Sequence, residues 1–422
     1  MPNGARPART PGLLFIVNSL EVGGAEKQVI ALINRIDTQR FRVHLAYLKR
    51  RETLLPQVDR ARLDALVCCD VSRGLERRAV HQLRELIETR SIDVIVCTNM
   101  YSMLYGTLAR SGCETRPQLV TVFHTMLLMS YTEKLQMLLY RRLIKRCDLL
   151  IYVCENQRRH WRRLGLHPDR DAVVHNGIDV GRFNDAHAGD HGSAFRQKLG
   201  FGPNDYVIGI CSALRPEKAH GDLLEAIARL RAAGVDVKAL LIGDGPERGA
   251  VERKIADLGI EEHVRITGTQ QDVRPFIAAC DVMALVSRTE TFSIAALEAM
   301  ALAKPLIMSE VGGASEQVIH GKNGLLFEPG DIDALVMHLR TLRSSALRQQ
   351  MGAAGSALVR QSFTLEKMTD GFTEQLTELL RSTQARRPAW LSHYGHGAGA
   401  RRDSPSAALP PRGKRSGGGT SP

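Results

Sequence analysis

Two glutamates eight positions apart, Glu290 and Glu298, frame a short apolar run in the stretch "ETFSIAALEAMALA". The apolar residues recur at helical spacing, which predicts a helix over residues 293–303 with Glu290 just before it and Glu298 inside it. An ordinary buried helix requires neither carboxylate. The first N–H groups of a helix bind phosphate, and carboxylates beside a phosphate site can accept hydrogen bonds from hydroxyls. The spacing therefore predicts a nucleotide-sugar site, in which Glu290 faces the transferred sugar and Glu298 the ribose.

Cations suited to a diphosphate occur in "SALRPEKAHGDLLEAI", where Arg215 and Lys218 lie between an expected strand and an expected helix. In "VNSLEVGGAEKQVIALI", Gly23 and Gly24 precede another expected helix. Adjacent glycines at such a point let backbone N–H groups approach an anion closely. A plain strand-to-helix turn would also explain these two glycines.

Other motifs give little support for NAD or for a metal. Gly243, Gly245 and Gly249 in "LLIGDGPERGAVE" have the spacing GxGxxxG, and no acidic residue ends a following strand, so the dinucleotide fingerprint is weak. The eight cysteines show no CxxC spacing and no tight Cys/His cluster. This scatter predicts reduced thiols in a cytosolic protein, without a disulfide framework or a zinc site.

The elements that would position these residues alternate between β-branched runs and helical patterns. Helical spacing over stretches such as 24–36 and 76–90 separates the runs. This alternation predicts an α/β protein with two doubly wound parallel sheets. Strands are expected at residues 12–18, 41–48, 92–99, 118–125, 147–154 and 172–177, and again at 206–214, 237–245, 264–269, 281–287, 305–310 and 324–330.

Length and composition support two domains. A chain of 422 residues with 44% hydrophobic content exceeds what one hydrophobic core usually serves. A polar break rich in Gly, His and Asp at residues 184–193 separates the two series of strands. Two Rossmann-like domains side by side would form a central cleft at their facing strand ends, where open α/β sheets bind ligands.

The formal charge of +12 is unevenly distributed. Residues 385–422 hold seven Lys or Arg against one Asp, among Gly, Pro, Ser and Ala, and are expected to be disordered. This basic tail could touch anionic lipid or nucleic acid, or stay solvated without a partner. Residues 1–11 lack an apolar core region, and no later run approaches the length of a membrane span. The expectation is a chain that is neither secreted through a conventional signal nor integral to a membrane.

Taken together, the motifs resemble those of retaining glycosyltransferases of sequence family 4, which have the two-domain GT-B fold. The resemblance runs from about Leu13 to Leu380. It implies transfer of a sugar from a nucleotide-diphosphate donor with retention of configuration, with no cofactor and no required metal. The motifs that carry it are "GGAEKQV", "VFHT", "VVHNGID", "RPEKAH", "LLIGDGPE", "ETFSIAALE" and "VGGASEQV".

The resemblance implies roles for residues of the second domain. Glu290 would contact the hydroxyls of the donor sugar, and Glu298 would contact the ribose. Phe292 and Ser293 would supply phosphate-facing backbone, and Lys218 would neutralise the leaving diphosphate. No carboxylate stands out as a nucleophile, so attack on the face that the leaving group departs from is favoured. The leaving phosphate oxygen would then take the proton of the acceptor.

Further roles fall on the first domain and on two departures from the family pattern. His124 would approach the donor sugar and complete the catalytic set, although a lone histidine could equally be a satisfied core residue. Gly24 would belong to the phosphate or acceptor loop. Many relatives carry an arginine where this chain has Ala213, and Arg215, which would point the same way in an extended segment, could replace it. Ser315 stands where proline is common.

The acceptor is indicated mainly by residues 131–148, "YTEKLQMLLYRRLIKRCD", which pair an apolar face with five basic residues against two acidic ones. Such a helix could lie on an anionic membrane surface and bring the site to a lipid-linked acceptor. It could also be a surface helix of the first domain, packed by its leucines. The aromatic residues are too few and too dispersed for a nucleic-acid platform, so no nucleic-acid partner is expected.

Strand series and resemblance give a domain map. It consists of a disordered N-terminus at 1–11, an acceptor domain at 12–183, a linker at 184–203, a donor domain at 204–350, C-terminal helices at 351–384 that pack back toward the first domain, and a disordered basic tail at 385–422.

Three functions are compatible with these features. The first is a retaining glycosyltransferase, cytoplasmic or peripheral at the inner membrane face, that acts on a lipid-linked oligosaccharide or polysaccharide in cell-surface or exopolysaccharide biosynthesis. The second is a sugar-nucleotide 2-epimerase on the same fold, and the third is a non-catalytic nucleotide-sugar binding protein. Intact Lys218, Glu290 and Glu298 argue against the third, and the motifs around them argue against the second. UDP, GDP and ADP are not distinguished, because backbone groups and loop shape read the base.

Overall fold

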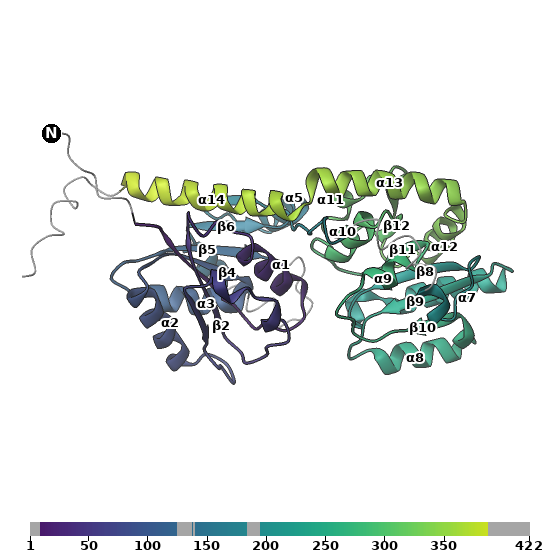
Figure 1. Cartoon of the computed structure of the whole chain (residues 1–422), viewed down its shortest axis with the longest axis horizontal. Coiled ribbons are helices and arrows are strands. Elements are labelled where there is room, and N and C mark those ends of the chain that lie inside the picture. The colour runs from purple at the N-terminus through teal and green to yellow at the C-terminus, as the bar shows by residue number, and fades with distance from the viewer. Residues whose placement is uncertain (1–8, 125–136, 138–139, 184–194, 387–422) are drawn as a thin grey trace, which may run out of the picture. The chain divides into compact units, whose positions relative to one another are not determined.

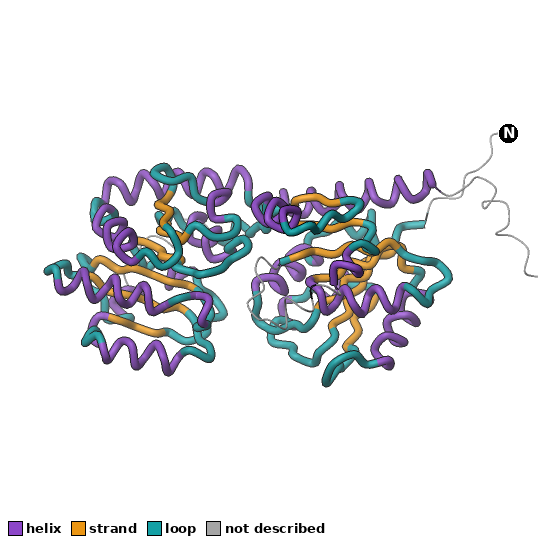
Figure 2. Tube along the Cα trace, turned by 180° about the vertical axis from the view of Figure 1, so that it is seen from behind, coloured by secondary structure: helices purple, strands orange, loops and turns teal. Residues whose placement is uncertain are grey.

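The computed structural model describes residues 9–124, 137, 140–183 and 195–386, which form two parallel sheets flanked by helices (Figures 1 and 2). The first sheet has seven strands in the order β3-β2-β1-β4-β5-β6-β7, and all neighbours pair in parallel. We call this sheet and its helices the first domain. Its strands are β1 (Gly12–Val17), β2 (Arg42–Tyr47), β3 (Ala65–Cys68), β4 (Ile92–Thr98), β5 (Gln118–Phe123), β6 (Leu149–Tyr152) and β7 (Asp171–Val173).

The second sheet, which with its helices we call the second domain, has six parallel strands in the order β10-β9-β8-β11-β12-β13. In both sheets the strand order reverses beside the first strand, and loops that leave such a switch point form ligand sites in open α/β sheets. The strands are β8 (Tyr206–Cys211), β9 (Val237–Ile242), β10 (Val264–Ile266), β11 (Val282–Leu285), β12 (Leu306–Ser309) and β13 (Gly324–Phe327).

Helices connect consecutive strands in both domains, as parallel pairing requires. In the first domain they are α1 (Gly24–Ile33), α2 (Arg77–Thr89), α3 (Asn99–Arg110) and α5 (Glu155–Arg163), with short 3-10 turns η1 (Leu55–Gln57) and η2 (Arg60–Arg62). The helices and 3-10 turns that come after β8 in the chain are η4 (Pro216–Lys218), α7 (His220–Ala232), α8 (Arg248–Asp257), η5 (Glu261–His263), α9 (Arg274–Ala278), α10 (Ile294–Ala301), α11 (Ala314–Gln317), α12 (Ile332–Thr341), α13 (Ser345–Ser362) and α14 (Leu365–Arg386). Of the helices in the described ranges, none combines the length and the apolar character needed to cross a bilayer.

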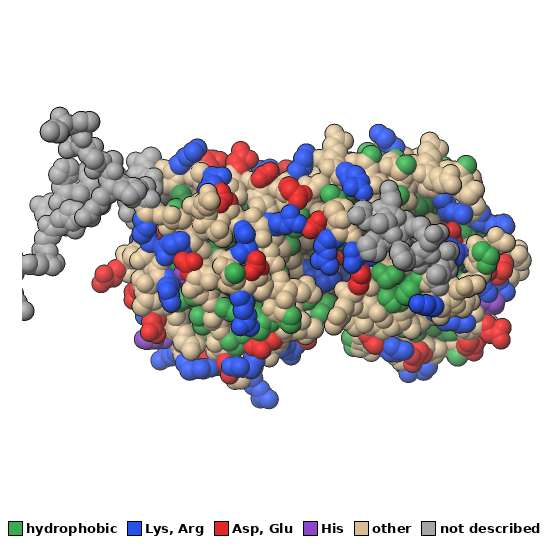
Figure 3. All heavy atoms as spheres, viewed as in Figure 1, with side chains coloured by type: hydrophobic (Ala, Val, Ile, Leu, Met, Phe, Trp, Pro, Cys, Tyr) green, Lys and Arg blue, Asp and Glu red, His purple; other side chains and the backbone are tan. Residues whose placement is uncertain are grey.

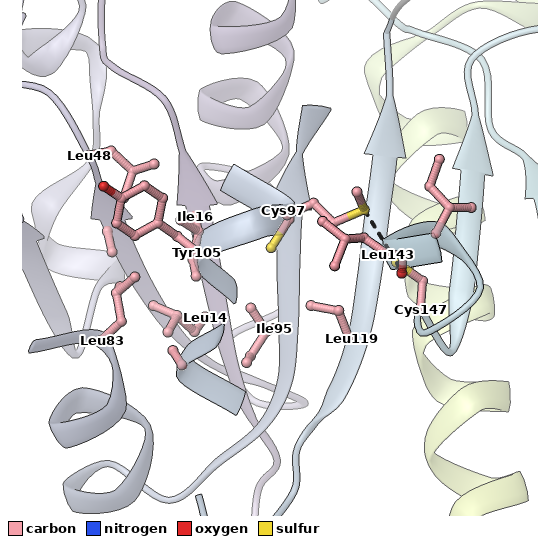
Figure 4. Close-up of a cluster of buried hydrophobic side chains, with 14 of the residues drawn as sticks. Leu14, Ile16, Leu48, Leu83, Ile95, Cys97, Tyr105, Leu119, Leu143 and Cys147 are labelled. Carbon is pink, nitrogen blue, oxygen red and sulfur yellow. Dashed lines mark hydrogen bonds between the residues drawn. The ribbon is translucent and has the colours of Figure 1, made fainter. Parts of the chain in front are cut away.

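Each sheet is buried by apolar side chains from its strands and its helices. In the first domain, strand residues such as Leu14 and Ile95 meet Leu83 of α2 and Tyr105 of α3 (Figure 4). All eight cysteines are free thiols, and none forms a disulfide. The buried ones act as small apolar residues, as Cys147 does, whose thiol lies 3.6 Å from the sulfur of Met103. A separate cluster fills the second domain around β8, β9, β11 and α7. Two full cores explain why the chain supports two domains.

Two chain segments that connect the domains pair with each other. The N–H of Ile178 donates to the carbonyl of Phe363, and the N–H of Leu365 donates to the carbonyl of Ile178. Beyond this bridge, α14 runs back along the first domain (Figure 1), where Glu378 forms an ion pair with Arg170 at 2.8 Å.

The prediction of two Rossmann-like parallel sheets is confirmed, and all twelve expected strands are present. The sequence analysis missed β3, which has only four residues, all half-buried, and pairs with β2 alone at the sheet edge. Such a strand lacks the long apolar run that marks a central one. The domain boundaries stay predictions. Several expectations lie partly or wholly outside the described residues, namely those for 1–11, 131–148, 184–203 and 385–422.

Candidate functional site

Four loops of the second domain leave the carboxyl ends of neighbouring strands. They follow β8 at 212–219, β9 at 243–247, β11 at 286–293 and β12 at 310–313. Because the strands are parallel and adjacent, the loops lie along one edge of the sheet. The predicted donor residues of this domain all lie in these loops or in the helix that follows β11.

Lys218 and Glu290, which lie 72 positions apart in sequence, form an ion pair with 2.5 Å between Nζ and Oε2. Each side chain is 20% exposed, so the pair is half-buried but reachable. Lys218 ends the turn η4, and Ala219 then adopts the left-handed conformation, with φ of 49°, that starts α7. The other oxygen of Glu290 accepts from the N–H of Thr291 at 3.2 Å. The fold thus unites the two residues predicted to hold the donor sugar and the leaving phosphate.

Ser293 is the N-cap of α10, the helix predicted to offer a phosphate site. Its hydroxyl caps the helix by accepting from the N–H of Ala296 at 3.2 Å. Its own N–H donates to the side-chain oxygen of Gln317, whose amide donates back to the Ser293 carbonyl at 2.7 Å. Within the described residues, the next two N–H groups, those of Ile294 and Ala295, have no hydrogen-bond partner. Contact between phosphate and the Ser293 backbone stays a prediction, and these two neighbouring groups are unengaged.

Phe292, the other predicted backbone contact, has a buried ring that packs against two rings outside the sheet. The centroid of His175 lies 5.2 Å away and that of Phe363 lies 5.4 Å away. Both belong to the chain segments that connect the domains. The ring therefore anchors the loop, and only the backbone of Phe292 is available for the predicted contact.

Glu298 lies inside α10, and its charge environment includes the first domain. Burial raises its pKa above the ordinary value, and the charges of Lys27 and Arg182 act in the opposite direction. Lys27 comes from the first turn of α1, within the "GGAEKQV" motif. Sequence reasoning did not single out Lys27, because a lysine on a helix is usually a solvated residue.

The glycine loop of the first domain approaches α10 closely. A Cβ on Gly24 would lie 3.3 Å from the terminal methyl of Ile294, the first residue of α10. Arg215 is exposed at the start of η4, and its charge interacts with Glu26, whose pKa is raised by burial. Gly24 and Arg215 are therefore both placed near residues of the opposite domain. Their roles in donor binding stay predictions.

His124 follows β5 and connects the first domain to the loop that carries Glu290. The backbone N–H of His124 donates to the side-chain oxygen of Asn99 at 2.9 Å, and its backbone carbonyl accepts from the hydroxyl of Thr291 at 2.6 Å. Among the described residues, its Nε2 is buried and has no hydrogen-bond partner, and burial lowers the pKa of His124 to about 4. The imidazole is therefore neutral at pH 7, and its predicted approach to the donor sugar stays a prediction.

The "VGGASEQV" segment packs against the backbone of the loop that carries Glu290. Gly312 has φ of +55°, and a Cβ there would lie 2.0 Å from the carbonyl oxygen of Glu290. Glu316 accepts from the N–H groups of Glu155 and Asn156 at the start of α5 and from His175 at 2.8 Å. Burial raises the pKa of Glu316, but these hydrogen bonds outweigh it and bring the value below its ordinary range.

The "GDGPE" glycines have a structural explanation in the loop after β9. A Cβ on Gly243 would lie 2.0 Å from the carbonyl oxygen of Ser212, and one on Gly245 would lie 2.4 Å from that of Leu214. These glycines let two strand-end loops touch through their backbones. Across the described residues, no group of three or more His, Cys, Asp or Glu is arranged to hold a metal ion.

Comparison with known proteins assigns the chain to a class. Residues 22–182 match the model of the family described as Glycosyltransferase Family 4, and residues 193–357 match that of Glycosyl transferases group 1. The two models together cover most of the chain. The protein belongs to the glycosyltransferases of sequence family 4, and the two parallel sheets have the GT-B architecture, as the sequence predicted.

Relatives with assigned names are similar over parts of their length. A Corynebacterium glutamicum protein named GDP-mannose-dependent monoacylated alpha-(1-6)-phosphatidylinositol monomannoside mannosyltransferase is 33% identical over 253 residues, which cover 57% of this chain and 64% of that protein. The Bacillus anthracis N-acetyl-alpha-D-glucosaminyl L-malate synthase is 32% identical over 187 residues, 44% of this chain and 49% of that protein. The aligned region thus spans about half to two thirds of these relatives.

Solved structures share the fold over nearly their whole length. Anabaena Alr3699/HepE, whose crystal structure was obtained in complex with UDP-glucose, superposes with a TM-score of 0.76 at 24% identity, covering 87% of this chain and 99% of that one. A glycosyltransferase from Rickettsia africae superposes with a TM-score of 0.75 at 19% identity, covering 88% and 99%.

Proposed function

We propose that the protein is a retaining glycosyltransferase that transfers a sugar from a nucleoside-diphosphate donor to a lipid-linked oligosaccharide or polysaccharide. The observation that carries this proposal is the half-buried Lys218–Glu290 pair beside the capped start of α10, with Glu298 in the same helix. A cation, two unengaged helix N–H groups and two carboxylates match the charges and hydroxyls of a nucleotide sugar. The names of the family and of its relatives support the same activity.

The proposed chemistry follows from where charge develops. When the anomeric bond breaks, positive charge appears on the sugar ring and negative charge on the departing diphosphate. Lys218 and the N–H groups of Ile294 and Ala295 would stabilise the diphosphate, which supplies most of the rate enhancement. The Glu290 carboxylate would accept from sugar hydroxyls and keep the lysine in place.

Retention is proposed to occur by attack on the face that the diphosphate leaves, with a phosphate oxygen taking the proton of the acceptor. His124 is not suited to act as a base on the acceptor at neutral pH, because a group with a pKa of about 4 binds protons weakly there. Its neutral ring is better suited to a hydrogen bond with a sugar hydroxyl. A 2-epimerase on the same scaffold would release its product without any acceptor, so dependence on an acceptor separates the two functions.

We also propose that the protein acts in the cytoplasm, at the inner face of the membrane. The described part of the stretch 131–148 ends in three exposed cations, Arg142, Lys145 and Arg146. Arg141 donates to the carbonyl of Leu164, which joins this stretch to the exposed basic end of α5. Basic clusters of this kind bind anionic lipid surfaces. Figure 3 shows Lys and Arg interspersed with Asp and Glu on the face that it draws.

The first experiment is thermal denaturation with UDP, GDP, ADP and NAD at matched concentrations. A ligand that binds only the folded state raises the midpoint. We expect one nucleoside diphosphate to raise it in the wild type and not in Lys218→Ala or Glu298→Ala. Lys254→Ala is a matched control, because Lys254 pairs with Glu225 at 3.3 Å, away from the strand-end loops. Stabilisation by NAD alone, or by none of the four, would contradict the donor site.

The nucleotide chosen in this way sets the sugar donors for transfer assays. Product should form only when a saccharide or lipid-linked acceptor is added, and anionic vesicles should increase the rate with a lipid-linked acceptor. Release of an altered sugar nucleotide without acceptor would instead establish the epimerase. Nucleotide binding without turnover under any of these conditions would support the binding protein.

A further inference from the structure

Arg288 connects the loop that carries Glu290 with the loop that carries Lys218. Its backbone N–H donates to the carbonyl of Glu217 at 2.8 Å, and Glu217 precedes Lys218 in the turn η4. Its guanidinium reaches Asp222 in the first turn of α7, where Nη2 lies 3.0 Å from Oδ1 and 2.7 Å from Oδ2. Arg288 thus contacts the chain on both sides of Lys218, and it lies two positions before Glu290.

The loop after β13 confines the same side chain. Gly330 lies in this loop, has φ of +89°, and would bring an added Cβ into collision with the guanidinium of Arg288. The missing side chain at Gly330 therefore leaves the space that the guanidinium occupies. A backbone hydrogen bond, an ion pair and this close approach together hold Arg288 in one place.

Another arginine of the second domain shows what is particular to this contact. Arg229 of α7 pairs with Glu225 in its own helix and with Asp333 of α12 at 2.8 Å. The side chains of Arg229 and Arg288 are both 46% exposed, but the side chain of Asp333 is 91% exposed and that of Asp222 only 15%. Ion pairs with exposed carboxylates are screened by water and constrain the chain little. The sheltered pair of Arg288 is therefore better suited to hold two loops together.

The Lys218–Glu290 pair needs such support, because its members lie in loops that follow different strands, β8 and β11. A lysine ammonium is a point charge on a flexible stem, so the backbone beneath it decides where the charge can lie. A displacement of about 1 Å at a reacting centre can lower the rate about 100-fold. Contacts that fix the two loops against each other would therefore act on the reaction itself.

We infer that Arg288 is a positioning residue for the proposed reaction, which holds Lys218 and Glu290 at their separation through Glu217 and Asp222. The inference rests on the proposed function and adds a residue to it. It also separates two roles for the guanidinium. A positioning arginine requires its carboxylate partner, whereas an arginine that binds the diphosphate directly would be more available without Asp222.

The test uses the full chain with the nucleoside-diphosphate sugar and the acceptor that the transfer assays establish. We would measure kcat, donor KM and the thermal midpoint for Arg288→Met, for Asp222→Asn and for the variant that combines them. Arg288→Met is also made in the Lys218→Met background. Arg229→Met is the matched control, because it removes an equally exposed arginine from an ion pair between two helices. Asp222→Asn keeps the shape of its side chain, so it tests the bridge independently of the arginine variants.

For Arg288→Met and for Asp222→Asn we expect kcat to fall about 10- to 30-fold, with donor KM changed less than about threefold. The combined variant should match the single ones, because residues that act as a unit have non-additive effects. For the same reason, Arg288→Met should lower the kcat of Lys218→Met by less than about threefold. Arg229→Met should keep the kinetics of the wild type, and each folded variant should still respond to the nucleoside diphosphate with a higher midpoint.

Two results would overturn the inference while the proposed function stands. One is an unchanged or higher kcat in either Arg288→Met or Asp222→Asn in a wild type that transfers sugar. The other is a full 10- to 30-fold loss on adding Arg288→Met to Lys218→Met, which would show that the arginine acts independently of the lysine. Absence of turnover in the wild type would overturn the proposed function, and the positioning role would fall with it.

Discussion

The two domains present similar strand ends to the candidate site, but their polar groups differ in how they are satisfied. In the second domain, the polar groups in these loops largely bind each other: Lys218 pairs with Glu290, and Ser293 exchanges two hydrogen bonds with Gln317. In the described part of the first domain, Asn18, Thr98 and His124 each keep a buried polar atom without a hydrogen-bond partner. One edge is organised by contacts among its own side chains, and the other has polar atoms without partners among the described residues.

This difference corresponds to two kinds of ligand recognition. A diphosphate carries the same charges whatever sugar it bears, so a rigid set of cations and N–H groups suits it. Under the proposed function, the acceptor would be recognised by its hydroxyl pattern, and isolated side chains at strand ends would suit that task. The predictions below test this division, beginning with the largest expected effect.

Removing the charge of Lys218 should have the largest effect. With Lys218→Met we expect kcat to fall about 100- to 1000-fold, because the variant loses a group that stabilises the departing diphosphate. Steady-state kinetics with the selected donor measures this loss. Lys254→Met, which removes a surface ion pair with Glu225, should keep wild-type kinetics. A fall of less than about threefold for Lys218→Met would show that the second domain does not carry the catalytic charge.

The two glutamates should separate catalysis from binding. Glu290→Gln keeps the shape but removes the charge that holds Lys218, and we expect kcat to fall about 10- to 100-fold with little change in donor KM. Glu298→Gln should instead raise donor KM about 10-fold at nearly constant kcat, because ribose contacts act equally in the ground and transition states. Initial rates at varied donor concentration distinguish the two patterns. A rise in donor KM for Glu290→Gln together with a fall in kcat for Glu298→Gln would exchange the roles assigned to the two glutamates.

The same difference explains what the sequence could reveal. The strands were predictable, because long apolar runs mark central strands. The placement of Lys218 and Glu290 in strand-end loops and of Glu298 inside the helix after β11 also followed from the sequence, while their roles stay predictions. Short β3 was missed, since a four-residue edge strand has no such run. The unpartnered atoms of Asn18 and Thr98 were not predictable, because spacing does not encode which polar atoms lack partners among the described residues. Lys27 was missed because only the fold brings its charge near Glu298.

Rigidity of the second-domain loops should depend on Gly312. In Gly312→Ala the positive φ costs about 1–2 kcal/mol, and the added Cβ would also strike the carbonyl oxygen of Glu290. Gly321→Ala is the matched control, with φ of +78° and nothing within 4 Å of the added atom. We expect Gly321→Ala to lower only the denaturation midpoint, and Gly312→Ala to lower both the midpoint and kcat. Equal kinetics in the two variants would indicate that the loop adapts freely.

The smallest expected effect concerns pH and one histidine from each domain. Burial lowers the pKa of both His124 and His220 to about 4. Between about pH 6.5 and 4 the unfolded chain binds protons at these positions and the folded chain does not, so stability is present at neutral pH and is lost on acidification. In His124→Asn or His220→Asn, the fall in midpoint between pH 7 and 5 should be smaller by about 2 to 4 °C.

The matched variant is His167→Asn, at an exposed position of the first domain, which should show the wild-type fall. A smaller fall in His124→Asn alone would assign the acid sensitivity to the first domain, and a smaller fall in His220→Asn alone would assign it to the second. A fall equal to that of the wild type in both variants would show that neither buried histidine contributes to the loss of stability at low pH.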